Sequence, residues 1–196
     1  MSPITHFLVG WTVLERFHAS NRDKAIVVFA GLAPDIDGIG IVIDFMTRTL
    51  GLAETNYYQD YHRLLGHGLP FALLLSLLAA AISIERRRVA LSSFVCIHLH
   101  FLCDLIGSRG STVDDIWPIY YLTPLSMTPQ FSWSLQWPLV GWQNMTITAI
   151  LLAAAMMRAA RLGYSPVSLV SARADQVFVA TIRRWKKSLG RVVGGN

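Results

Sequence analysis

The feature that most constrains this chain is an apolar stretch, residues 89–107, that carries imidazole and carboxylate groups near its C-terminal end. A helix of this length can be buried or can cross a membrane. His100 and Asp104 are four residues apart, so a helix places their side chains on one face, a spacing that can chelate a metal ion. His98 lies about 200° around the helix from His100 and is not expected to join them. The alternative is a buried structural histidine that is hydrogen-bonded within its own helix.

Composition favours a membrane protein over a soluble domain. Hydrophobic residues make up 53% of the 196 residues and charged residues 15%, which is too little charge to cover a water-facing surface. The formal net charge of +5 comes from short basic clusters beside apolar runs, an arrangement typical of the cytoplasmic flanks of membrane segments. The clusters are residues 86–88, Arg158 with Arg161, and Arg183 and Arg184 with Lys186 and Lys187. Nucleic-acid binding is the weaker interpretation of this charge.

The apolar periodicity predicts an all-α fold, a membrane-embedded or membrane-associated helical bundle with a His/Asp metal cluster. Helices are expected over residues 3–18, 25–33, 69–84, 89–107 and 141–157. Ser2 and Pro3 suit an N-cap and first helical position, and His6 would then face inward. No signal peptide is recognisable, so insertion is expected to use internal segments. A compact helical protein attached to one leaflet is the alternative.

Two regions of the chain are expected to differ in role. Residues 1–162 would form the membrane domain and residues 163–196 a basic amphipathic tail on the anionic inner leaflet, the alternative being a partly disordered tail. Tryptophan, tyrosine and proline are dense in residues 108–140, which suits a loop at the membrane interface. Asp114 and Asp115 in this loop could be extra ligands, although solvated carboxylates are the preferred interpretation.

Two further motifs add candidate ligands. Asp35 and Asp37 follow Pro34 inside an apolar region, where carboxylates are costly unless a cation compensates them. A metal ion would do so, and a turn that caps the next helix is the alternative. His62 and His67 precede the apolar run 69–84, which forms a hairpin with residues 89–107. That hairpin would bring His67 and Asp104 to the same depth.

Together these motifs predict a metal centre. Too many imidazoles and carboxylates are present for one tetrahedral zinc, so they suit two or three ions, with zinc preferred and manganese or iron also compatible. The two cysteines, Cys96 and Cys103, are too far apart along one helix for a disulfide and are expected to be packing residues. The candidate ligands are His6, Asp35, Asp37, His62, His67, His100 and Asp104.

The motifs resemble a known family when they are taken in order. Thr5-His6, Pro34-Asp35-Ile36-Asp37, His62-Arg63-x3-His67 and His100-x3-Asp104 are similar to the YdjM-like family of bacterial inner-membrane metal-dependent hydrolases. That family is distantly similar to zinc-dependent phospholipase C and the S1/P1-type nucleases. The resemblance covers roughly residues 3–125 and implies phosphoester hydrolysis, with LexA as a possible partner. Unlike phospholipase C, the sequence shows no processed N-terminal tryptophan, and Gly66-His67-Gly68 replaces the expected Thr-His-Ser.

The resulting expectation is a multi-pass membrane-bound hydrolase that acts on a phosphoester bond in a lipid or lipid-linked substrate. Asp35 or Asp37 would orient the attacking water, and Arg63 would bind a phosphate oxygen, its alternative being an interfacial arginine. The basic clusters place the C-terminus in the cytoplasm and the metal centre near the outer face. The competing hypothesis is a non-catalytic protein that binds or transports a metal ion with the same residues.

Overall fold

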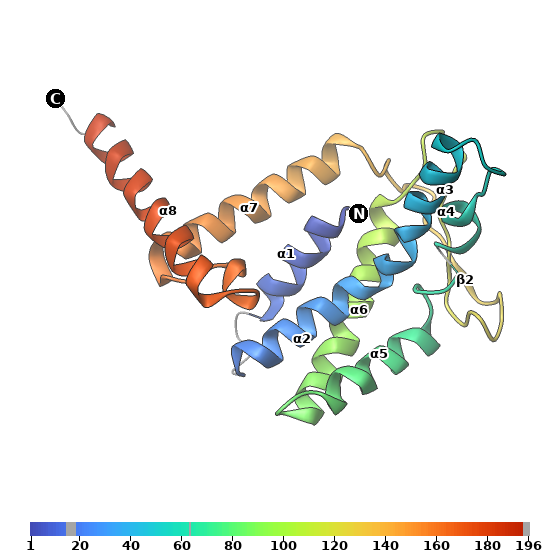
Figure 1. Cartoon of the computed structure of the whole chain (residues 1–196), viewed down its shortest axis with the longest axis horizontal. Helices are drawn as coiled ribbons and strands as arrows, with labels where there is room; N and C mark the ends of the chain where they lie inside the picture. Colours follow the sequence, from blue (N-terminus) through green and yellow to red (C-terminus); the bar gives the residue numbers. More distant parts are fainter. Residues whose placement is uncertain (15–18, 63, 194–196) are drawn as a thin grey trace.

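The chain folds as a helical bundle, as the apolar periodicity predicts. We describe it from a computed structural model, which covers residues 1–14, 19–62 and 64–193 (Figure 1). The bundle is built from α1 (Pro3–Val13), α2 (Asn21–Leu32), α5 (Leu69–Ala81), α6 (Arg86–Gly107) and α7 (Trp142–Leu162). The predicted fold class is therefore confirmed.

Helix α6 is the central element of the bundle. Both α2 and α5 pack along it, while α1 lies between α2 and α7 (Figure 1). Small and branched side chains are frequent in the buried core, and Val27, Val28 and Ile97 are fully buried. Close packing of this kind fixes the relative positions of α1, α2 and α6. Helices α1 and α6 carry three of the seven candidate ligands, His6, His100 and Asp104.

Two helices, α6 and α7, are long and apolar enough to cross a membrane. With 22 residues, α6 is roughly 33 Å long, which matches the roughly 30 Å hydrocarbon core of a bilayer. A bend of 41° joins the α2 region to α3 (Gly40–Thr49), and this bent pair passes the same test. Large apolar side chains cover the outer surfaces of α5 and α7, as membrane helices require.

Several helix ends differ from the predicted ones, and for α5 a contact that is distant in sequence explains the difference. Helix α5 ends at Ala81 rather than residue 84, since the Asp23 carboxylate accepts hydrogen bonds from the backbone amides of Ile84 (3.0 Å) and Glu85 (2.9 Å) and fixes a turn there. Helix α6 begins at Arg86, so the basic cluster lies in its first turn. The α-helical part of the first segment ends at Val13, and residues 15–18 lie outside the described part of the chain.

The connection between α2 and α5 is irregular. A 3₁₀ segment, η2 (Ala33–Ile39), carries the Pro34-Asp35 motif and leads into α3. The short helix α4 (Tyr57–Tyr61) follows α3. The Asp44 side chain accepts hydrogen bonds from the backbone amides of Tyr57 (2.8 Å) and Tyr58 (2.9 Å), which ties α3 to α4.

Residues 108–140 form a loop over one end of the bundle, with a small antiparallel pair, β1 (Ile119–Tyr120) and β2 (Gln130–Phe131). Helix α7 ends at Leu162 and is capped by Gly163, whose φ is +82°. A short 3₁₀ turn, η3 (Pro166–Leu169), then precedes α8 (Ala172–Val193). Helix α8 packs on α7 and η3 near its start, and its C-terminal half points away from the bundle (Figure 1).

Candidate metal centre

Four side chains from three elements converge at one end of the bundle. His6 comes from α1, Asp35 from η2, and His100 and Asp104 from α6. One possible ligand atom from each lies within 4.8 Å of the others. His6 and His100 are buried, and Asp35 is partly buried. Such a group of nitrogen and oxygen donors could hold a metal ion.

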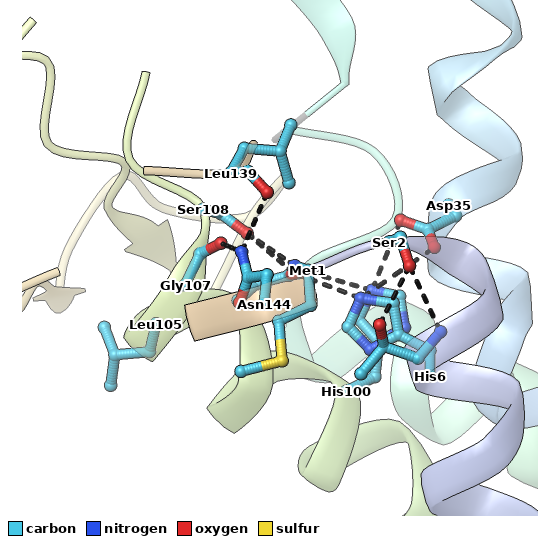
Figure 2. Close-up of polar contacts among 12 residues, drawn as sticks. Met1, Ser2, His6, Asp35, His100, Leu105, Gly107, Ser108, Leu139 and Asn144 are labelled. Atoms are coloured by element: carbon cyan, nitrogen blue, oxygen red, sulfur yellow. Dashed lines mark hydrogen bonds and ion pairs between the residues drawn. The ribbon is translucent and has the colours of Figure 1, made fainter. Parts of the chain in front are cut away.

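The donor atoms face a common point. His100 Nε2 lies 3.0 Å from Asp104 Oδ2 and 3.6 Å from Asp35 Oδ1, while His6 Nε2 lies 3.1 Å from Asp104 Oδ1. The imidazoles of His6 and His100 are stacked, with ring centroids 3.7 Å apart. Figure 2 shows this stack with the Asp35 carboxylate beside it. Two adjacent turns of α6 and one face of α1 thus present their side chains to the same place.

The orientation of His100 is fixed by a helix packed against it. Its Nδ1 lies 3.0 Å from the carbonyl oxygen of Gly31 on α2. A carbonyl can only accept, so Nδ1 carries the hydrogen and Nε2 presents its lone pair to the cluster. Gly31 makes this approach possible, because a Cβ there would lie 3.0 Å from Cys96 Cβ on α6. The close contact between α2 and α6 therefore sets the tautomer of a candidate ligand.

His67 lies next to the four-residue group. Its Nε2 is 3.3 Å from Asp104 Oδ2 and 3.3 Å from His100 Nε2, as expected from the predicted hairpin. It precedes α5, and the neighbouring Gly68 lies against the loop, where a Cβ would be 2.7 Å from the carbonyl oxygen of Thr123. A side chain at this position would displace the loop. The glycine thus allows the His67 segment to lie between α6 and the loop.

The remaining candidates are farther away or outside the described part. The His62 ring is stacked on Tyr58 at 4.6 Å and lies 5.4 Å from the His67 ring. The side chain of Asp37 and the whole of Arg63 lie outside the described part of the chain. Asp114 and Asp115 are exposed on the loop, and His98 instead contacts the Tyr121 hydroxyl at 3.0 Å.

Two contacts to Asp104 were not predicted. The amine of Met1 contacts Asp104 Oδ1 and lies 2.8 Å from Ser108 Oγ, and that hydroxyl donates to Asp104 Oδ1 at 2.7 Å. The sequence does contain a signal for Ser108, because it lies one helical turn beyond Asp104, at the same spacing as Asp104 from His100. A serine was not among the residue types considered as ligands. No sequence signal places Met1 beside α6.

Two buried polar atoms of the cluster have no hydrogen-bond partner among the described residues, which is consistent with a site that binds a cation. Among the described residues, His6 Nδ1 and Asp35 Oδ2 are buried atoms without a hydrogen-bond partner. A buried polar atom left in this state costs about 1–3 kcal/mol. A divalent ion ligated through the Asp35 carboxylate would remove that cost for Oδ2. Imidazole and carboxylate donors without a thiolate suit zinc, manganese or iron.

A cavity of about 660 Å³ adjoins the cluster. Asp35, His67 and Asp104 line its polar end. Residues 1–3, Tyr58 and His62 also line the cavity. The loop and the N-terminal half of α7 contribute an apolar part of the wall, formed by Ile119, Leu139, Val140, Met145, Ala149 and Leu152. A small molecule could therefore reach the cluster from this side.

Comparison with known proteins gives one family. A family model described as YdjM inner membrane protein matches residues 1–182, which is most of the chain. No curated protein and no solved structure matches the chain. The match contains every element that contributes to the cluster.

Proposed function

This chain belongs to the YdjM inner membrane protein family, and we propose that it is a membrane-bound, metal-dependent hydrolase of phosphoester bonds. The observation that carries the proposal is the His6, Asp35, His100 and Asp104 cluster, whose donor atoms lie within 4.8 Å of one another and whose two carboxylates line a cavity. Buried structural histidines have no need of such a cavity. Hydrolytic metal centres do, because substrate and water must reach an open coordination position.

The four clustered residues would hold one ion, and His67, whose Nε2 lies 3.3 Å from both Asp104 Oδ2 and His100 Nε2, would be a further ligand to it or to a neighbouring ion. Zinc is our preferred metal, in two or three equivalents, with manganese or iron as alternatives. When bound, such ions lower the pKa of a coordinated water and stabilise charge on phosphoryl oxygens.

The residues of the chain itself have three tasks in this proposal. Asp35, whose Oδ2 lacks a hydrogen-bond partner among the described residues, would orient the attacking water or accept its proton. Asp37 is a second candidate for that role, and Arg63 would bind a non-bridging phosphate oxygen. The apolar cavity wall limits the access of bulk water, which strengthens the electrostatic interactions inside.

The test is metal content, measured by mass spectrometry on detergent-purified protein, together with hydrolysis of soluble and lipid phosphoesters. The double variant His100→Ala with Asp104→Ala is compared with His98→Ala, which removes an imidazole of the same helix that lies outside the cluster. We expect at least two equivalents of metal in the wild type and in the His98 variant, and loss of metal and hydrolysis in the double variant.

Two results would contradict the proposal in different ways. Equal metal content in the wild type and the double variant would show that the cluster is not the metal centre. Metal binding that depends on the cluster, without hydrolysis of any phosphoester, would instead favour the non-catalytic alternative, a membrane protein that binds or transports metal ions.

A further inference from the structure

The cavity beside the cluster is much larger than a phosphate group requires. We propose that its apolar part is a binding groove for the hydrocarbon tail of a membrane lipid whose phosphate-bearing head lies at the His/Asp cluster. The inference rests on the proposed function and assigns the substrate class. The groove is defined here as the wall formed by Leu139, Val140, Met145, Ala149 and Leu152.

Polarity changes along the cavity in the way that a lipid phosphate changes along its length. The two carboxylates of the cavity lie near the C-terminal end of α6, together with the polar side chains of His67, Ser108 and Asn144. On α7 beyond Asn144, the polar lining is the hydroxyl of Thr148. The groove residues continue from there along α7 and carry no charge. A water-soluble phosphoester would leave this apolar surface unused, and apolar surface of this kind marks a ligand groove or a lipid contact. An amphiphile would use both ends.

The length of the groove fits one leaflet of a bilayer. From Asn144 to Leu152 the α7 part spans roughly 12 Å at 1.5 Å per residue, and Leu139 and Val140 extend it ahead of the helix. Half of a hydrocarbon core is roughly 15 Å. A tail bound here would therefore run to about the depth that it has in the surrounding membrane.

The groove is open on the side where lipid is expected. Helix α7 is apolar and long enough to cross a membrane, and Val140, Met145 and Leu152 are exposed despite their size. On the inner side, the hydroxyls of Thr5 and Thr148 lie 2.7 Å apart and join α1 to α7. This bond closes the inner wall. A lipid would therefore enter from the bilayer rather than through the bundle.

The test uses a substitution that fills the groove and leaves the residues of the cluster unchanged. Ala149→Trp places an indole on the groove wall, and Ile150→Trp, the matched control, places it on an exposed position of the same helix outside the cavity lining. The probes are dioleoyl phosphatidic acid in mixed micelles and p-nitrophenyl phosphate. We expect Ala149→Trp to lower the ratio of kcat/KM for the lipid over the soluble ester about tenfold, the equivalent of losing contact with two methylenes. The control keeps the wild-type ratio.

A second measurement does not depend on catalysis. Native mass spectrometry of the same proteins, incubated with dioleoyl phosphatidic acid, should detect bound lipid in the wild type and in Ile150→Trp and at least several-fold less in Ala149→Trp. If Ala149→Trp does not fold, Ala149→Leu replaces it, with a smaller change in the same direction. Ile150→Leu is then the control.

The outcomes separate the groove from the proposed hydrolase. Equal lipid binding and equal kcat/KM ratios in the Ala149 and Ile150 variants would overturn the groove, even if the protein is a hydrolase. Absence of hydrolysis in the wild type would overturn the hydrolase, while lipid retention that depends on residue 149 would still support the groove. Hydrolysis of the soluble ester alone, with no lipid bound, would also overturn the groove.

Discussion

At the scale of single residues, the Asp104 carboxylate makes the contacts that join the segments of the candidate centre. It contacts His6 of α1, His67 before α5, His100 on its own helix and Ser108 directly after that helix. A buried carboxylate is tolerated when several donors or cations compensate its charge. Each contacting segment is thereby held to α6 near its C-terminal end.

The carboxylate of Asp35 is the clearest single test of metal binding. Asp35→Asn replaces one ligand oxygen by an amide nitrogen that cannot ligate a cation, so we expect the metal dissociation constant to rise at least about tenfold. Asp114→Asn, on the exposed loop, is the matched control and should keep the wild-type value. The measurement is competition with a chromogenic chelator. An unchanged constant in Asp35→Asn would remove Asp35 from the ligand set.

A second residue-scale prediction concerns the close contact of α2 with α6. Gly31→Ala places a Cβ 3.0 Å from Cys96 Cβ, so we expect it to lower the free energy of unfolding by about 1–3 kcal/mol. Gly10→Ala has its nearest neighbour at 3.8 Å and should instead stabilise α1 by up to about 1 kcal/mol. Denaturant unfolding in detergent distinguishes them. Equal stability of the two variants would argue against the packing described here.

The sequence predicted some of these residues better than others, for physical reasons. His100 and Asp104 follow from a local rule, since residues four apart share a helix face. In contrast, His100 is oriented by the backbone carbonyl of Gly31, which is 69 residues away in the sequence. Every residue has a backbone carbonyl, so a sequence pattern does not indicate which one makes this contact. Asp35 was predicted as a ligand because a carboxylate in an apolar region needs a compensating partner. The sequence pattern did not indicate which residues lie beside it.

At the scale of elements, the loop over the bundle is held by side chains that bind the C-terminal end of α6. Gln136 is buried, and its Nε2 donates to the carbonyls of Asp104 (2.9 Å) and Leu105 (3.0 Å). Asn144, at the start of α7, donates to the carbonyl of Gly107 at 2.7 Å. Both amides satisfy helix-end carbonyls that no longer have a partner within α6.

We expect Gln136→Ala to destabilise this junction. It leaves the Asp104 and Leu105 carbonyls without the amide donor, at a cost of about 1–3 kcal/mol, and loosens the turn that carries Asp104. The apparent Tm in detergent should fall by several degrees, and metal affinity should fall with it. Gln130→Ala, exposed in β2, should change neither quantity. A Gln136 variant with the wild-type Tm would show that the loop is held in another way.

Element boundaries were less predictable than element types. The helices lie where the apolar segments predict them, but α5 stops at Ala81 because Asp23 binds the amides that follow it. The apolar run continues past that point, so nothing local marks the stop. The pair β1 and β2 was not predicted either, because two-residue strands carry no alternating pattern.

At the scale of the whole molecule, the His/Asp cluster and the basic clusters lie at opposite ends of α6. Asp104 is in the last turns of this 22-residue helix, and residues 86–88 are in its first turn. Helix α7 repeats the arrangement, with Asn144 near the cluster and Arg161 at its far end. From the positive-inside rule we expect the basic end to face the cytoplasm and the cluster to face the outer side.

Cysteine labelling tests this orientation. In a chain with Cys96→Ala and Cys103→Ala, Leu135→Cys on the exposed loop should react with a membrane-impermeant maleimide in intact spheroplasts. Arg87→Cys should react only after the membrane is opened. Labelling of both positions from the same side would show that α6 does not cross the bilayer. That result would favour the alternative of a protein attached to one leaflet.

The shortness of α5 has a consequence for the membrane around the protein. Its 13 residues span roughly 20 Å, about 10 Å less than an average hydrocarbon core, yet Leu73, Leu74, Leu77 and Leu78 face outward like the surface of a full-length span. In a bilayer that surrounds α5, the adjacent lipids would have to adopt a thinner layer, at fractions of a kcal/mol per Å of hydrophobic mismatch. The resulting local thinning would bring the aqueous phase closer to the buried histidines. The protein would then be sensitive to the thickness of the bilayer that contains it.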